Sequence, residues 1–164
     1  MEGRARLLGH PIHQMLIVFP LGLLATAVIL DLVALITNSA RWHEVAFWMV
    51  GAGVLGGLLA APFGLIDWLG IPGGTRAKRI GALHGLGNVV VVGLFAASWL
   101  LRRDAPAAPE GAALVLSFVG GGLAFVTGWW GGELVDRMGI GVDTGAHPNA
   151  PSSLSGRPAT ESAR

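Results

Sequence analysis

Four long apolar stretches dominate the chain, at about residues 13–36, 45–69, 79–101 and 111–132. Each is close to the ~20 residues that an α-helix needs to cross the roughly 30 Å hydrocarbon core of a bilayer. None shows the polar stripe that a helix of a soluble domain turns to water. The pattern predicts an all-α fold, an integral membrane four-helix bundle over residues 1–142, with the lipid bilayer as its surroundings.

The segments between these stretches are short, so consecutive helices are expected to be antiparallel neighbours. Pro20 and Pro62 lie inside predicted spans and should kink them. Thr75 is placed to cap the third helix. The first span lacks a small-x-small cleavage site and is expected to be retained. Residues 143–164 are rich in Ser, Pro and Ala, which predicts a disordered polar tail without chemistry.

Composition agrees with a membrane protein. Hydrophobic residues make up 52% of the 164 residues and charged residues only 13%. A formal net charge of +1 gives no reason to expect a nucleic-acid partner. The sequence contains no cysteine, which excludes a disulfide, a thiolate metal site and an iron–sulfur cluster built by this chain alone.

Charges near the spans predict the orientation. Basic residues on the N-terminal face are Arg4, Arg6, Arg76, Lys78, Arg79 and Arg137, and those on the opposite face are Arg41, Arg102 and Arg103. Because cytoplasmic loops carry the excess of Lys and Arg, both termini are expected in the cytoplasm. Tryptophans near the span ends, at positions 42, 48 and 99 on one side and 68, 129 and 130 on the other, are typical of interfacial belts.

Small residues recur every four positions in three spans and predict close helix packing. They are Gly53, Gly57 and Ala61, then Gly81 and Gly85, then Gly120, Ala124, Gly128 and Gly132. Residues 56–64 also match residues 120–128 at five of nine positions. We therefore predict a duplicated helical hairpin, which would place His13 and His84 opposite one another at the same membrane face.

Ionisable side chains at membrane depth are costly, so each raises a functional question. Six fall toward the N-terminal face: His10, His13, Asp67, His84, Glu133 and Asp136. Asn88 lies one helical turn beyond His84 and shares its face. A purely structural interpretation makes these histidines interfacial caps, and the acids would be solvated and neutralised by nearby basic residues.

Two chemical interpretations remain open beside the structural one. In the first, His13 and His84 are axial ligands of a haem b, with Asn88 beside them, in an electron-transfer role. In the second, a divalent metal is held by nitrogen and oxygen ligands drawn from His10, His13, Asp67, His84 and Glu133. The sequence lacks the His-Glu-x-x-His and phosphate-loop motifs and suggests no catalytic residue, so an enzymatic activity is not favoured.

On the opposite face, Asp31 is expected to pair with Arg41 or Arg102. His43, between Trp42 and Glu44, is expected to have an interfacial role.

Several ordered motifs resemble one family. They are Gly9-His10-Pro11-x-His13, Phe19-Pro20-Leu21-Gly22, residues 64–68, residues 75–79, His84-x-x-x-Asn88 and residues 132–135. Together they are similar to the uncharacterised bacterial membrane family known as domain of unknown function 2231, over about residues 9–142. The resemblance implies four helices in a bacterial inner membrane. It also marks His10, His13, Asp67, His84 and Asn88 as family-typical.

Some members of that family carry a Rieske iron–sulfur module beside this domain, which implies redox work and a redox partner protein. This chain has no such module, and it has Met138 where the resemblance leads us to expect a histidine. The interpretation is a multi-pass inner-membrane subunit that binds haem or metal through the cluster on the cytoplasmic face. The alternative is a non-catalytic scaffold or partner subunit, and either could form a homo-oligomer.

Overall fold

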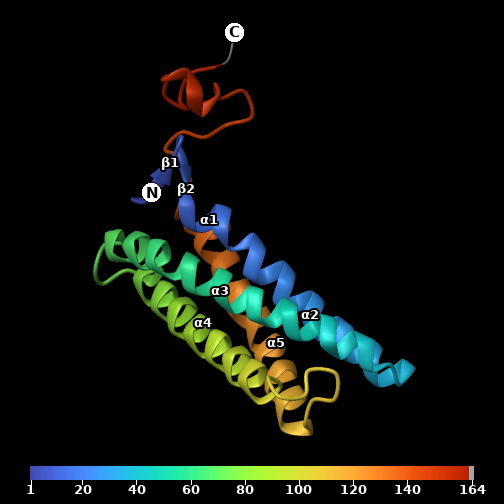
Figure 1. Ribbon diagram of the computed structural model, residues 1–164. Helices are drawn as coiled ribbons and strands as arrows, with labels where there is room; N and C mark the ends of the chain where they lie inside the picture. Colours follow the sequence, from blue (N-terminus) through green and yellow to red (C-terminus); the bar gives the residue numbers. More distant parts are fainter. Residues whose placement is uncertain (163–164) are drawn as a thin grey trace.

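The computed structural model describes residues 1–162 and contains four long antiparallel helical segments (Figure 1). The first consists of α1 (Ile12–Leu16) and α2 (Val18–Thr37); the others are α3 (Ala40–Gly70), α4 (Arg76–Leu101) and α5 (Gly111–Gly132). A π-helical turn, η1 (Glu133–Arg137), extends α5. All four segments are long and apolar enough to cross a membrane, which confirms the predicted all-α membrane bundle.

The second span starts earlier than its hydropathy predicts. α3 begins at Ala40 rather than at about residue 45, so that Arg41, His43 and Glu44 are helical. A search for apolar stretches does not detect this first turn of α3, because of its polar residues. His43 is nevertheless buried, because its ring is paired with Asp31 of α2.

Pro20 accounts for the break between α1 and α2. Proline has no N–H to donate to the carbonyl of Leu16, four residues earlier, and its ring crowds that carbonyl. The flanking bonds, from Ile17 N–H to the His13 carbonyl and from Leu21 N–H to the Ile17 carbonyl, are still made. The helix is thus interrupted at Ile17, three residues before Pro20, whereas α3 runs without interruption through Pro62. A kink at either proline stays a prediction.

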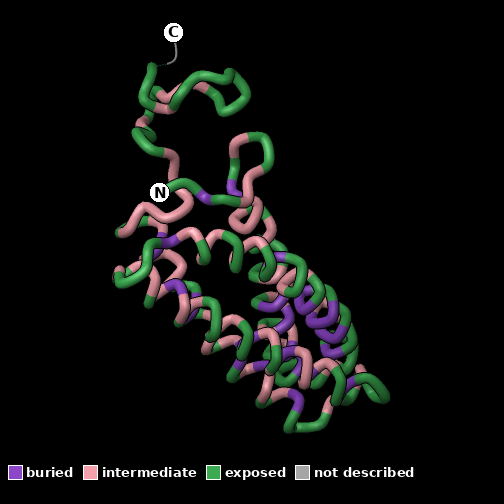
Figure 2. Tube along the Cα trace, turned by 90° about the vertical axis from the view of Figure 1, so that its left-hand side faces the viewer, coloured by how far each residue is buried: buried purple, intermediate pink, exposed green. Residues whose placement is uncertain are grey.

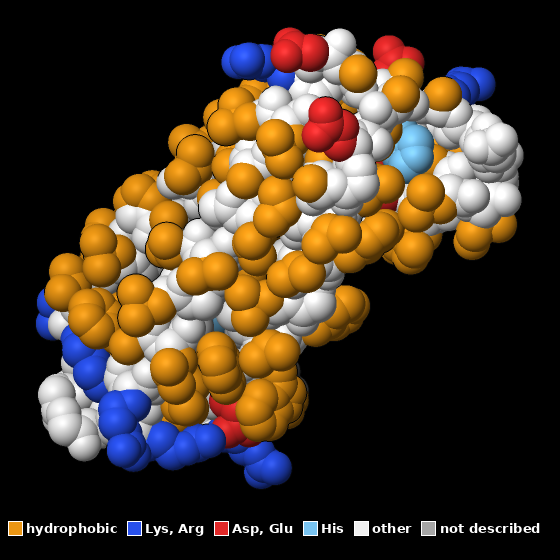
Figure 3. Space-filling model, turned by 90° about the horizontal axis from the view of Figure 1, so that it is seen from below, with side chains coloured by type: hydrophobic (Ala, Val, Ile, Leu, Met, Phe, Trp, Pro, Cys, Tyr) orange, Lys and Arg blue, Asp and Glu red, His pale blue; other side chains and the backbone are white. Residues whose placement is uncertain are grey.

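The outer surface of the bundle is apolar between its two ends, and the core cluster is made of aliphatic residues and one phenylalanine. Figure 3 shows a broad hydrophobic band between two ends where charged side chains gather. Buried positions lie on the inner sides of the helices (Figure 2). The central cluster consists of Leu24, Ala27, Ala46, Val50, Val54, Val91 and Phe95. Because lipid tails are as apolar as these side chains, close packing rather than water exclusion holds the helices together.

Only part of each predicted glycine stripe serves that packing. A Cβ on Gly53 would lie 2.6 Å from the Leu24 side chain, and one on Gly120 would lie 3.0 Å from Phe95. Gly85 and Gly128 have no described atom within 4 Å of an added Cβ. The close approaches are therefore specific contacts, and the other glycines face outward.

The N-terminus and the last described residues, up to residue 162, lie at one end of the bundle (Figure 1). Two short strands, β1 (Arg6–Leu7) and β2 (His10–Pro11), pair as a hairpin there. Beyond residue 142 the described chain forms turns and one 3₁₀ turn, η2 (Ser153–Ser155), without an α-helix or strand up to residue 162. The lack of an α-helix or strand between residues 143 and 162 fits the disordered polar tail predicted for residues 143–164.

The same contacts recur in the two hairpins. His13 of α1 bonds the carbonyl of Ala60 on α3, and His84 of α4 bonds the carbonyl of Thr127 on α5. Ala60 and Thr127 are 67 residues apart, whereas the match between residues 56–64 and 120–128 gives a shift of 64. The contacts thus favour the duplicated hairpin but correct its register by three residues, close to one helical turn.

Candidate functional site

His13 and His84 lie next to each other near the N-terminal face, as the duplication predicts. Their ring centroids are 6.5 Å apart and their planes are perpendicular. His13 Nδ1 lies 3.0 Å from the Ala60 carbonyl oxygen, and His84 Nδ1 lies 2.8 Å from that of Thr127. A carbonyl oxygen can only accept, so in both rings Nδ1 carries the proton and donates it. Each Nε2 is then left with a free lone pair.

Each histidine ring is seated against a glycine. A Cβ on Gly64 would lie 2.8 Å from His13 Cε1, and a Cβ on Gly131 would lie 3.1 Å from His84 Cε1. Each glycine follows by four residues the residue whose carbonyl the ring bonds, so carbonyl and glycine share one helix face. These two seats fix where both rings can lie.

Asn88 completes the surroundings of His84. Its amide nitrogen donates to the backbone carbonyl of His84 at 2.9 Å, and its amide oxygen accepts from the Thr127 hydroxyl at 3.1 Å. The same amide nitrogen lies 3.3 Å from His84 Nε2. Asn88 therefore links α4 to α5 and stands beside the free nitrogen of the ring.

The other predicted ligands do not join this pair. Asp67 accepts the backbone N–H groups of Arg4 and Ala5 at 2.6 and 3.0 Å, so it fastens the N-terminal segment to the end of α3. Glu133 pairs with Arg76 at 2.7 Å. His10 Nε2 lies 3.3 Å from the Ser153 hydroxyl. Within residues 1–162, no three His, Cys, Asp or Glu side chains gather so as to hold a metal ion.

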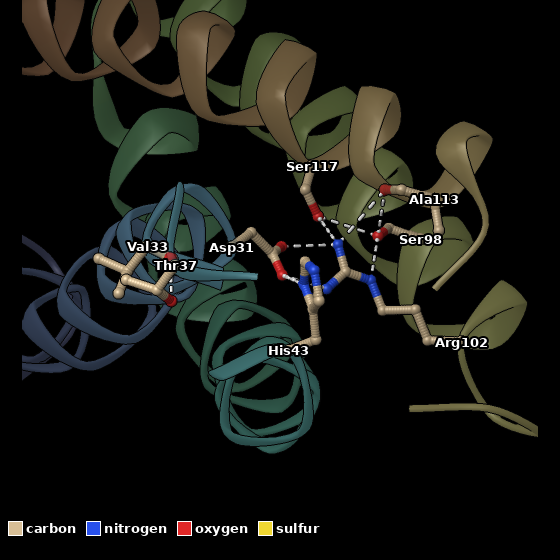
Figure 4. A network of polar contacts seen from close by, with 8 residues as sticks. All are labelled: Asp31, Val33, Thr37, His43, Ser98, Arg102, Ala113 and Ser117. Atoms are coloured by element: carbon tan, nitrogen blue, oxygen red, sulfur yellow. Dashed lines mark hydrogen bonds and ion pairs between the residues drawn. The ribbon is translucent and has the colours of Figure 1, made fainter. Parts of the chain in front are cut away.

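A second polar cluster lies at the opposite end of the bundle (Figure 4). Asp31 and Arg102 are fully buried and meet through two hydrogen bonds, of 2.9 and 2.8 Å. Arg102 also donates to the hydroxyls of Ser98 and Ser117, at 3.1 and 2.9 Å. Of the two predicted partners of Asp31, the structure confirms Arg102.

Sequence reasoning missed the remaining members of this cluster. His43 is only 9% exposed rather than interfacial, and its Nδ1 lies 2.8 Å from Asp31 Oδ1. The available signal was a spacing of four residues between Ser98 and Arg102, which puts both on one side of α4. Ser117 could be found only from the packing of α5 against α4.

Asp31 and Arg102 are separated by 71 positions, and so are His13 and His84. Equivalent positions of the two hairpins therefore meet at both ends of the bundle. One end joins two imidazoles and the other joins an acid to a base.

Fold and sites together define a polytopic α-helical membrane protein with a paired-histidine site. The chain belongs to the family described as predicted membrane protein (DUF2231), whose model matches residues 9–144. This confirms the resemblance drawn from its motifs. Neither a curated protein nor a solved structure matches the chain.

Proposed function

We propose that the protein is a membrane electron-transfer subunit that binds a haem b between His13 and His84. The observation that carries the proposal is the arrangement of the two rings. Each is held by an Nδ1 hydrogen bond to a backbone carbonyl, which leaves Nε2 as the acceptor nitrogen of the ring; at His84 this nitrogen lies 3.3 Å from the Asn88 amide nitrogen. Metal-bound histidines usually donate their second ring nitrogen in this way, which fixes the tautomer and the ring orientation.

The separation of the rings suits two ligands on one metal ion. Two metal–nitrogen bonds of about 2 Å, with roughly 1 Å from each nitrogen to its ring centre, place opposed imidazole centroids about 6 Å apart. The centroids of His13 and His84 are 6.5 Å apart. The observed separation is therefore close to that expected for two such ligands.

The number of ligands favours haem over a bare metal ion. Protein zinc sites use three or four protein ligands, and the described part of the chain gathers no such set. A haem brings its own equatorial nitrogens and needs only axial ligands from the protein. Two histidines from facing helices of a bundle meet that need.

When bound, haem would supply a one-electron redox centre. The residues of this chain would hold and tune it. The carbonyls of Ala60 and Thr127 would hold both rings in the tautomer that carries the proton on Nδ1 and presents Nε2 to the iron. Asn88, 3.3 Å from His84 Nε2, would move aside from that nitrogen while keeping its bond to Thr127. A redox partner protein would exchange the electron.

The test is the absorption spectrum of protein expressed with ample haem and purified in mild detergent. We expect a Soret band and the low-spin spectrum of two imidazole ligands. His13→Ala and His84→Ala should each abolish the low-spin signature. His10→Ala is the matched control, since His10 lies on the same face but contacts Ser153, and it should keep the spectrum unchanged. A colourless wild type, or a low-spin spectrum retained in His84→Ala, would reject the proposal.

A non-catalytic scaffold is the second candidate, and one observation favours it. Both histidines already link helices through interhelical hydrogen bonds, as they would in a purely structural role. In that case His84→Ala lowers thermal stability by about 1 kcal/mol while wild type and variant both lack cofactor. Metal and haem analysis on the same samples separates the two functions.

We propose further that both termini face the cytoplasm of a bacterial inner membrane, as the excess of basic residues near the N-terminal face supports. The absence of cysteine allows single-cysteine labelling on an otherwise unreactive chain. In intact cells, a membrane-impermeant maleimide should label Asp104→Cys and spare Ser155→Cys. The opposite labelling pattern would reverse the orientation. A homo-oligomer stays a prediction.

A further inference from the structure

A pocket of about 190 Å³ opens at the end of the bundle opposite the histidine pair. It lies beside the turn between α2 and α3 and is closed on one side by the loop after α4. Its lining residues are Ala34, Leu35, Asn38, Ser39, Ala40, His43 and Ala107. No part of the haem proposal uses this pocket.

The hydrogen bond that His43 can offer to a ligand in the pocket depends on which of its ring nitrogens carries the proton. Arg102 donates a hydrogen bond to each carboxylate oxygen of Asp31, so both oxygens act as acceptors. An ionised carboxylate only accepts hydrogen bonds, so His43 Nδ1 must carry the proton that it donates to Asp31. In the neutral ring, Nε2 is then an acceptor. Since His43 lines the pocket, its free edge offers a hydrogen-bond acceptor to a ligand there.

Size and lining narrow the class of ligand. An apolar cavity of roughly 150 Å³ can hold a benzene molecule, so a pocket of about 190 Å³ has room for one substituted ring. The walls from Ala34, Leu35 and Ala107 are apolar, and a few polar groups converge from the turn. The exposed lining as a whole is more polar than apolar, because the turn and His43 contribute to it.

The location indicates that such a ligand comes from the bilayer. Leu35 in the pocket wall is 52% exposed and the neighbouring Ile36 is 82% exposed, both on the lipid-facing side of the last turn of α2. A molecule with an apolar tail could lie along this surface while its ring enters the pocket. The ring would need a hydroxyl group to donate to His43.

We propose that this pocket binds the ring of an amphipathic hydroquinone, with one ring hydroxyl donating to His43 Nε2. Asp31 and Arg102 act as positioning residues, because they fix the tautomer and orientation of His43 without touching the ligand. The proposal concerns binding alone and is independent of haem at the other end of the bundle.

The experiment is isothermal titration of the full-length protein in lipid nanodiscs with a hydroquinone that carries a decyl chain. We expect saturable binding with one site per chain. The dimethyl ether of the same molecule has the same ring and tail without O–H donors. It should bind about tenfold more weakly, as expected for loss of one buried hydrogen bond.

Two variants test the site itself. His43→Phe removes the acceptor, and Ala107→Leu fills the pocket from the loop while leaving His43 and its partners in place. Both should weaken binding about tenfold or more. His147→Phe, in the exposed C-terminal segment, is the matched control and should bind as wild type. If His43→Phe does not fold, Ala107→Leu and the ether still decide the outcome. Absence of saturable binding, equal binding of the ether, or unchanged binding by Ala107→Leu would overturn the proposal.

Discussion

Arg102 holds both carboxylate oxygens of Asp31, and neither side chain is exposed. The pair connects the end of α2 to the end of α4, and Ser117 attaches α5 to it. The other hydrogen bonds of the guanidinium go to the hydroxyls of Ser98 and Ser117 and to the carbonyl of Ala113. The pair therefore ties three helices together at the face opposite the histidines.

Removing one partner should be costly. Arg102→Met leaves the buried carboxyl group of Asp31 without its basic partner, and we expect the free energy of unfolding to fall by about 3–5 kcal/mol. The double variant Asp31→Leu, Arg102→Met removes both charges and should recover at least half of that loss. Thermal unfolding in detergent, followed by circular dichroism, measures both values. A double variant no more stable than Arg102→Met would contradict the expected coupling.

The glycine seats of the histidines give a second prediction. Gly64→Ala places a methyl group 2.8 Å from His13 Cε1 and should push the ring off the Ala60 carbonyl. We expect a loss of about 1–3 kcal/mol from overpacking, together with loss of any bound haem. Gly128→Ala is the control, because no described atom lies within 4 Å of the added carbon. It should leave stability unchanged or raise it by up to ~1 kcal/mol. Equal effects of the two substitutions would show that the His13 ring does not need a glycine at position 64.

Substitution of Trp99 is expected to leave stability unchanged or to raise it, unlike the destabilising substitutions above. Its indole Nε1–H is buried without a hydrogen-bond partner among residues 1–162, while its ring stacks on Phe47 with centroids 5.6 Å apart. Trp99→Phe keeps an aromatic ring and removes the unpaired donor, so stability should be unchanged or higher by about 1 kcal/mol. Trp68→Phe is the comparison, because Trp68 Nε1 donates to the Lys78 carbonyl at 3.1 Å. It should lower stability by about 1 kcal/mol. A marked loss in Trp99→Phe would show that its N–H has a partner.

Asp67 is expected to control the N-terminal segment rather than ligand binding. It accepts two backbone N–H groups, from Arg4 and Ala5, and Asp67→Ala removes both bonds. Amide hydrogen exchange of residues 2–8 should then accelerate about tenfold or more, while the four spans keep their protection. Asp136→Ala, at the same face, is the control and should leave that segment unchanged. Unaltered exchange in Asp67→Ala would contradict the fastening role.

The spans and the histidine pair were predictable, whereas most polar contacts were not. Long apolar stretches specify membrane helices almost by length alone, and the repeat placed His13 opposite His84. The start of α3 at Ala40 escaped prediction because Arg41 and Glu44 interrupt the apolar pattern. The role of Asp67 depends on a backbone segment that folds back over the membrane face, and hydropathy carries no signal for that. Ser117 reaches Arg102 only through the packing of α4 against α5.

The predicted shift of 64 residues between the two hairpins was wrong because it rested on residue identity alone. The match at a shift of 64 aligned glycine with glycine, but glycines in this chain serve two purposes, as helix contacts and as outward-facing positions. The histidine contacts at Ala60 and Thr127 distinguish the two purposes, and they require a shift of 67. A three-dimensional contact thus decides a register that residue identity alone leaves ambiguous.

The two ends of the bundle differ in what a single-hairpin ancestor could have built. In a symmetric homodimer, a residue on the twofold axis meets its own copy, so two histidines can face each other but an aspartate would face an aspartate. Under the predicted duplication, an acid at position 31 with a base at position 102 requires the two hairpins to be parts of one chain. Under that duplication, the ion pair of Asp31 and Arg102 is an asymmetry that two identical hairpins could not have had, whereas the histidine pair is an arrangement that they could have shared.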